Sequence, residues 1–182
     1  MREDKLYLIG VVSDVSNLYD LILKEKEKNM KDTFTECYNK NGFKELCKKF
    51  LDKNPRPSYA FIMIDLDDFK AINDNFGHNT GDRVLLETVK QLREFFPRPS
   101  LIGRFGGDEF MVLCPFSQKE LLEETINHFM ECTIPPYSVK KSVGYTFIPD
   151  DKINYEEIIK TADKALYTAK QKKNCAVFSS IS

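Results

Sequence analysis

Two groups of acidic side chains stand where a sequence could carry metal and phosphate chemistry. Asp65 ends an apolar run and opens an acidic segment, and Asp108 and Glu109 follow a pair of glycines. Carboxylates that gather at the ends of strands repel one another unless a cation lies between them. Mg²⁺ binds through one or two such carboxylates and keeps its remaining positions for water and phosphate oxygens. These residues therefore predict a metal and phosphate site.

The glycine pair, Gly106 and Gly107, joins two apolar segments at residues 101–105 and 109–115. This pattern predicts a β-hairpin whose tip carries Asp108. Because glycine has no Cβ, the backbone at the tip could approach a phosphate or a ribose closely. A glycine pair taken alone is more typical of an ordinary turn, so the flanking residues must decide between the two interpretations.

The elements that must position these residues are indicated by apolar patterning. Residues 59–65 form a continuous apolar run, which predicts a buried central strand that ends on Asp65. The other patterns predict helices at residues 41–51, 81–96, 118–130 and around 158–169, and strands at 137–147 and 176–180. We therefore expect an α+β fold, with a mostly antiparallel central sheet flanked by helices.

Length and composition limit the function classes. The 182 residues are enough for one catalytic domain with a sizeable core. A formal net charge of -1 gives no positive field for nucleic acid, and no apolar run approaches the roughly 20 residues that a membrane helix needs. The five cysteines are odd in number and widely spread. We expect no nucleic acid partner, no membrane contact by this fragment and a cytoplasmic location.

Two long motifs resemble the GGDEF domain family, the diguanylate cyclases. The segment from Arg104 to Phe110 reads Arg-Phe-Gly-Gly-Asp-Glu-Phe, which matches the motif that names the family. The segment from Asp65 to Asp82 is similar to the family's second long block, and the likeness covers residues 32–178. The resemblance implies the palm-like fold of nucleotidyl cyclases.

By this resemblance, the metal ligands would be Asp65, the carbonyl of Leu66, Asp108 and Glu109, with Asp108 and Glu109 also catalytic. They would hold two Mg²⁺ ions per active site, for which Mn²⁺ could substitute. The family assigns guanine recognition to the positions of Asn73 and Asp82, and an amide with a carboxylate suits the guanine edge. The other substrate-binding positions would be Phe69, Lys70, Gly106, Gly107, Lys170 and Lys173.

The implied reaction joins two GTP molecules into cyclic di-GMP and releases pyrophosphate. Each domain would bind one GTP, so catalysis would need a homodimer in which two GGDEF domains face each other. Three other functions stay open: a catalytically weak or inactive GTP-binding regulatory domain, a cyclase with relaxed base choice, and a polymerase palm. Asp82 favours guanine, and the near-neutral charge disfavours a polymerase.

The first 30 residues are expected to lie outside the catalytic domain, which would span residues 31–182. Residues 5–12 form a short apolar run that resembles the last strand of a PAS sensor domain. Residues 15–30 follow, with alternating charges from Lys24 to Lys28, and predict a connector helix. An upstream sensor domain in a larger parent protein is therefore an expected partner.

The sequence departs from the family pattern at several positions. Pro97 and Ser100 stand where members with product inhibition carry Arg and Asp, so we expect no inhibitory site of that type. Glu36 replaces the usual glycine of the opening motif. The closing motif, Ala-Lys-Gln-Lys-Lys-Asn, lacks the usual glycine, which leaves open whether Lys173 acts as the second phosphate-binding cation.

Overall fold

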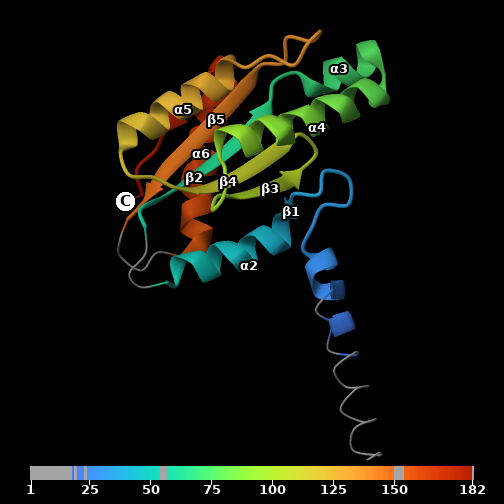
Figure 1. Cartoon of the computed structure of the whole chain (residues 1–182). Coiled ribbons are helices and arrows are strands. Elements are labelled where there is room, and N and C mark those ends of the chain that lie inside the picture. Colours follow the sequence, from blue (N-terminus) through green and yellow to red (C-terminus); the bar gives the residue numbers. More distant parts are fainter. Residues whose placement is uncertain (1–17, 19, 23, 54–56, 150–153, 182) are drawn as a thin grey trace, which may run out of the picture.

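A six-stranded sheet forms the centre of the molecule in a computed structural model that describes residues 18, 20–22, 24–53, 57–149 and 154–181 (Figure 1). The strand order is β1-β3-β4-β2-β5-β6. The strands are β1 (Tyr38–Asn39), β2 (Tyr59–Leu66), β3 (Leu101–Gly106), β4 (Glu109–Pro115), β5 (Lys141–Ile148) and β6 (Ala176–Phe178). The helices are α2 (Lys40–Leu51), α3 (Phe69–Phe76), α4 (His78–Phe95), α5 (Lys119–Glu131) and α6 (Tyr155–Lys172).

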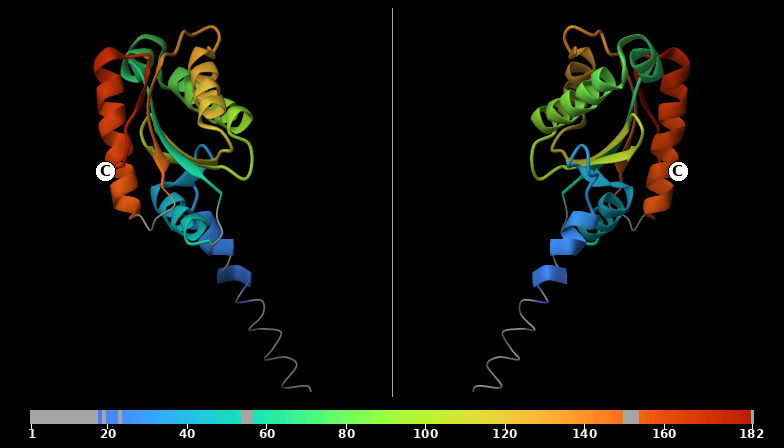
Figure 2. Two further views of the ribbon diagram at one scale, coloured as in Figure 1. Left: turned by 90° about the vertical axis from the view of Figure 1, so that its left-hand side faces the viewer. Right: turned by 90° about the vertical axis from the view of Figure 1, so that its right-hand side faces the viewer.

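The sheet is mostly antiparallel, as the sequence predicted. The inner pairs β3–β4, β4–β2 and β2–β5 are antiparallel, and the two outer strands β1 and β6 pair in parallel with β3 and β5. Helices cover both faces, with α6 on the side opposite α4 and α5 (Figure 2). The expected α+β architecture is therefore confirmed.

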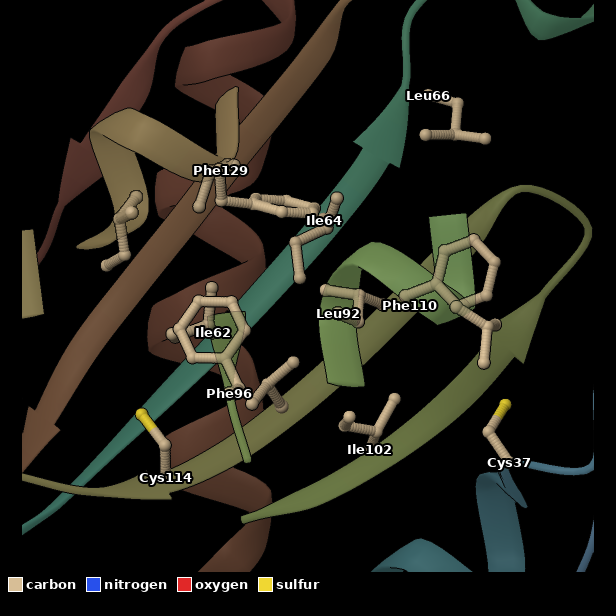
Figure 3. Packing of buried hydrophobic residues seen from close by; sticks show 14 of the residues in the cluster. Cys37, Ile62, Ile64, Leu66, Leu92, Phe96, Ile102, Phe110, Cys114 and Phe129 are labelled. Atoms are coloured by element: carbon tan, nitrogen blue, oxygen red, sulfur yellow. The ribbon is translucent and has the colours of Figure 1, made fainter. Parts of the chain in front are cut away.

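Residues of β2 alternate between two hydrophobic cores, because successive strand side chains point to opposite faces. Ile62 and Ile64 pack with residues of α4 and α5, such as Leu92 and Phe129 (Figure 3). Phe61 and Met63 pack on the other face, which α2 and α6 cover. The alternation carries Asp65 onto the face that is covered by α6.

Gly144 in β5 allows α6 to lie unusually close to the sheet. A Cβ at this position would lie 2.1 Å from the backbone nitrogen of Leu166 and 2.4 Å from the carbonyl oxygen of Ala162. Both atoms belong to the backbone of α6, which cannot move aside as a side chain could. The glycine therefore sets the distance between the sheet and the helix that carries Lys170.

Most predicted elements are present, and one begins later than expected. The strand predicted at residues 137–147 is β5, which starts only at Lys141. Before it, Ile134 and Tyr137 form an isolated bridge around Pro135 and Pro136. Neither proline has an N–H group to donate to a strand ladder. The chain therefore forms a loop here, and β5 begins only after this loop.

Two elements were not predicted. α3 has only eight residues and none of them is fully buried, although Phe69 and Ile72 pack partly buried against the core, and β1 has only two residues. Residues 24–29 are helical, in agreement with the predicted connector, whereas the strand expected at residues 5–12 lies outside the described residues. Among the helices that the structure describes, none is long and apolar enough to cross a membrane.

Candidate active site

The two acidic groups meet at one edge of the sheet. Asp65 and Glu109 are direct partners in the antiparallel register of β2 and β4. Glu109 is the first residue of β4, so the tip of the β3–β4 hairpin, with Asp108, lies beside the end of β2. The strand pairing therefore brings Asp65 together with Asp108 and Glu109, which lie more than 40 positions later in the sequence.

Lys170 near the end of α6 reaches into this group of carboxylates. Its Nζ lies 2.7 Å from Oδ2 of Asp65 and 3.8 Å from Oε1 of Glu109. The Asp65 side chain is only 8% exposed, whereas that of Lys170 is 43% exposed. A buried acid is thus paired with a lysine that also faces solvent.

Burial and mutual repulsion act on the protonation of these acids. Burial raises the pKa of Asp65, and the charge of Asp108 adds to this effect, while Lys170 opposes it. Burial also raises the pKa of Glu109, and Asp65 and Asp108 again contribute. Burial disfavours the charge on Lys170, but its hydrogen bond to Asp65 and the nearby acids outweigh burial and raise its pKa. The site therefore favours an added cation.

The donors suit magnesium more than a metal held wholly by protein. Within the described part of the chain, no group of three or more His, Cys, Asp or Glu side chains is already arranged as a metal site. Instead, the ammonium of Lys170 lies between Asp65 and Glu109 as a cation would. Mg²⁺ uses few carboxylates and completes its shell with water and phosphate. These residues fit such an ion.

A second ion pair joins the end of β2 to the end of α6. Nζ of Lys173 lies 2.7 and 2.8 Å from the two carboxylate oxygens of Asp68. Next to this pair, the buried carboxylate of Asp67 accepts a hydrogen bond from Oγ of Ser142 at 2.7 Å and from the backbone N–H of Asn174 at 2.8 Å. The two segments are therefore held together at the same edge of the sheet as Asp65.

Sequence reasoning did not include Asp67 and Asp68 among the site residues. Their position in the acidic segment was the available signal, but their partners are between 75 and 107 positions away. The backbone explains the local geometry: Asp68 and Lys173 both have left-handed conformations, with φ of 57° and 56°. Each residue turns the chain sharply at the end of its element.

Arg104 fixes the hairpin tip to the start of the domain. Its Nε and Nη2 donate to the carbonyl of Gly107 at 2.9 and 2.7 Å, and its Nη1 lies 3.2 Å from Asp32. Asp32 also accepts hydrogen bonds from the backbone N–H and hydroxyl of Thr35. Burial opposes the Asp32 charge, but Thr35 and Arg104 outweigh it and lower its pKa. We call Asp32 and Arg104 the hairpin clamp.

The residues expected to recognise guanine come together where α3 and α4 meet. A Cβ at Gly81 would lie 2.0 Å from Oδ1 of Asn73 and 3.1 Å from the ring of Phe69. Asn73 and Phe69 are half-buried, and Asp82, the next residue in α4, is exposed. Lys70, in the first turn of α3, is also exposed. These four predicted substrate positions therefore lie on α3 and near the start of α4, in the part of the chain that follows β2.

The hairpin tip is open on its outer side. A Cβ at Gly106 or Gly107 would meet no atom within 4 Å, and both residues are exposed. Gly107 has a φ of +51°, which favours glycine, but Gly106 has no such conformation. Packing among the described residues therefore does not require glycine at position 106.

Solved structures with a similar fold are GGDEF domains. The chain is similar to diguanylate cyclase SiaD of Pseudomonas aeruginosa, solved in complex with its activator SiaC, with a TM-score of 0.75 and 29% identity over 97% of this chain and 74% of that one. It is also similar to a microbial GGDEF domain from a structure on its interaction with cyclic di-GMP, with a TM-score of 0.76 and 28% identity over 83% and 99% of the chains. The molecule therefore has the palm-like GGDEF fold.

The family model "Diguanylate cyclase, GGDEF domain" matches residues 29–175, so the chain belongs to the GGDEF domain family. It is 31% identical over 150 residues to the probable diguanylate cyclase DgcC of Escherichia coli K12, covering 78% of this chain and 40% of that protein. It is 30% identical over 168 residues to diguanylate cyclase DgcP of Pseudomonas aeruginosa, covering 87% and 25%. The chain thus spans less than half the length of these relatives.

Proposed function

We propose that this chain is the catalytic domain of a diguanylate cyclase, which condenses two GTP molecules into cyclic di-GMP and pyrophosphate. The observation that carries the proposal is the meeting of Asp65, Asp108 and Glu109 at one edge of the sheet, with Lys170 as their counter-ion. Membership of the GGDEF family and about 30% identity to proteins named diguanylate cyclases support the same reaction.

The carboxylates would hold two Mg²⁺ ions, or Mn²⁺ in their place. Asp65, the carbonyl of Leu66, Asp108 and Glu109 are the proposed ligands. Bound magnesium would neutralise phosphate charge and lower the pKa of the attacking 3′-hydroxyl. Asp108 lies at the hairpin tip, and we propose that its carboxylate also assists removal of the hydroxyl proton.

The proposed nucleotide site extends from the hairpin across the β2 exit. Lys170 and Lys173 would pair with phosphate oxygens, and the backbone around Phe69 and Lys70 would contact them from the start of α3. The exposed glycines of the hairpin would allow the ribose and phosphates to come close to the backbone. Asn73 and Asp82 would bind the guanine edge, since an amide and a carboxylate offer the required donor and acceptors.

Ring closure requires two such sites. One domain holds one GTP, so the 3′-hydroxyl of each nucleotide must face the α-phosphate of the other across a homodimer. Large apolar side chains at Leu18, Leu21 and Ile22 are exposed in the segment before the domain. Contacts of this segment with a second copy would bring the domains together, under the control of an upstream sensor domain.

The test is a product assay on the chain fused to a constitutive dimeriser. Incubation with GTP and Mg²⁺ should give cyclic di-GMP, resolved by chromatography, with two pyrophosphates released per product. An equimolar mixture of ATP and GTP should give the same product, which would distinguish a guanine-specific cyclase from one with relaxed base choice. A dimerised protein that binds GTP and forms no cyclic product would contradict the proposal.

A GTP-binding regulatory domain is the second candidate. The chain is 28% identical over 147 residues to the cyclic di-GMP phosphodiesterase PdeR of Escherichia coli K12, covering 77% of this chain and 22% of that protein. A domain of this kind can therefore be part of proteins named for the opposite reaction. The acidic residues and both hairpin glycines are present here, which favours catalysis.

A further inference from the structure

Lys170 occupies the place between two acids at which the proposed function requires a metal. Its ammonium is 2.7 Å from Asp65 and 3.8 Å from Glu109, and these two residues are direct partners across β2 and β4. Both acids lie on the face that α6 covers, and Gly144 lets α6 approach that face closely. The position of Lys170 is thus set by the packing of the whole helix on the sheet.

A lysine and a metal ion cannot share this position at low cost. A magnesium–oxygen bond is about 2.0–2.1 Å long, so an ion on the same oxygen of Asp65 would lie within a few ångströms of the ammonium. Two cations at that separation repel strongly near a buried carboxylate. The side chain of Lys170 is 43% exposed and flexible, so it can leave.

We propose that Lys170 is the counter-ion of the metal-free site, and that its release couples the binding of the metal to the binding of the nucleotide. The inference rests on the proposed function. A metal ion that binds alone must displace the lysine from Asp65 and leave it without a partner. A metal ion that arrives with a triphosphate displaces the lysine onto a phosphate oxygen, where it regains a charged partner.

The coupling is reciprocal, because binding free energies of two ligands on one protein are linked. Metal should strengthen nucleotide binding by the same factor by which nucleotide strengthens metal binding. In addition, the lysine compensates part of the negative charge of the acids when no nucleotide is present. The site would therefore hold little metal until GTP is bound.

The experiment titrates Mn²⁺, detected by the electron paramagnetic resonance signal of the free ion, into the full chain. The titration is done with and without a GTP analogue that has a methylene group between its α and β phosphorus atoms. Without the analogue, Lys170→Met should bind Mn²⁺ about tenfold more tightly than the parent chain, within the usual range of coupling factors. The analogue should strengthen Mn²⁺ binding in both chains, because its phosphate oxygens bind the ion, but by a smaller factor in Lys170→Met than in the parent chain.

Two further variants define the comparison. Lys172→Met removes a charge from the same helix at an exposed position and should behave as the parent chain. Lys170→Arg keeps the charge and should keep the coupling. Circular dichroism must show the same thermal unfolding for all chains, and Lys170→Gln replaces Lys170→Met if the latter unfolds.

The possible outcomes distinguish a failure of the proposed role of Lys170 from a failure of the proposed metal site. Equal or weaker Mn²⁺ binding by Lys170→Met without nucleotide would overturn the coupling, even if the parent chain binds metal and nucleotide. No Mn²⁺ binding by any variant in either condition would overturn the proposed metal site itself.

Discussion

The backbone of Gly81 lies directly against the side-chain amide of Asn73. A Cβ on residue 81 would lie 2.0 Å from Oδ1 and 2.9 Å from Cγ of Asn73. The amide is the free end of a side chain on α3, so it can move, whereas the backbone of α4 at this point is held in the helix. A methyl group here would therefore displace Asn73 rather than disrupt the fold.

The first prediction concerns base recognition. Gly81→Ala should raise the KM for GTP about tenfold and lower the preference for GTP over ATP, because a misplaced amide loses a hydrogen bond worth about 1–2 kcal/mol. The melting temperature should change little. Steady-state kinetics with both nucleotides, with Asn73→Ala as a matched variant, measures this effect. Unchanged selectivity in both variants would show that Asn73 does not contact the base.

The hairpin clamp leads to the second prediction. Arg104→Met removes both hydrogen bonds to the carbonyl of Gly107, next to Asp108, so the tip loses its fixed position. Turnover should fall ten- to a hundredfold, roughly the effect of an ångström of misplacement. Arg83→Met, at an exposed position of α4, is the control and should be neutral.

A narrower variant tests the same clamp from its other end. Asp32→Asn keeps an oxygen that can accept from Thr35 but loses the charge that faces Arg104. Turnover should fall less than in Arg104→Met, because the two bonds to Gly107 remain. Full activity of Arg104→Met would show that catalysis does not depend on the hairpin clamp.

The backbone of Lys173 gives the third prediction. Its φ of 56° and ψ of 155° lie at the edge of a region that is essentially restricted to glycine. Lys173→Gly should raise the melting temperature by about 2–4 °C, as expected for relief of strain in a chain of this size. The KM for GTP should rise several-fold, because the proposed phosphate partner is lost.

A matched glycine substitution separates backbone strain from loss of charge. Lys172→Gly lies in the last turn of α6, where glycine costs about 0.5–1 kcal/mol, so its melting temperature should fall. Calorimetry on both variants compares the two effects. A lower melting temperature for Lys173→Gly would mean that the left-handed conformation stores no strain.

Lys141 gives a prediction on pH. The residue is completely buried, its Nζ donates to the carbonyls of Phe129 and Cys132, and burial lowers its pKa from 10.5 to about 8. Between about pH 8 and 10.5 the unfolded chain binds more protons at this position, so stability should rise with pH there. The increase in unfolding free energy that Lys141 causes over this pH range is at most about 3 kcal/mol.

The measurement compares the pH dependence of two proteins rather than their absolute stabilities. Lys141→Met also leaves two carbonyls without their donor, so it should be less stable at every pH. The difference in unfolding free energy between the parent chain and Lys141→Met should increase from pH 8 to pH 10. A constant difference across this range would show that Lys141 titrates normally.

Apolar patterning was sufficient for the elements that build the core. The buried run that became β2, and the helical spacing that became α4 and α6, follow from burial on one or both faces. The patterning also placed Asp65 at the end of a strand. It did not predict α3, a helix of eight residues that packs on α4 and whose Phe69 and Ile72 are only partly buried against the core.

The charged contacts of the site could not be predicted from the sequence. Lys170 and Asp65 are 105 positions apart, and the packing of α6 on β2 and β5 brings them together. One departure from the family pattern has a backbone counterpart. Glu36, which stands where the opening motif has glycine, has a positive φ of 58°.

The most direct test of the central claim is product formation by Asp108→Ala in the dimerised chain. Asp108 is half-buried beside Asp65 and Glu109, so its removal relieves repulsion and should not lower the melting temperature. Asp74→Ala, an exposed acid on α3, is the control.

Cyclic di-GMP formation by Asp108→Ala should fall at least about a thousandfold, since a bound metal is worth several kcal/mol in the transition state. Asp74→Ala should retain the activity of the parent chain. Undiminished product from a folded Asp108→Ala protein would contradict the assignment of this acidic group as the catalytic metal site.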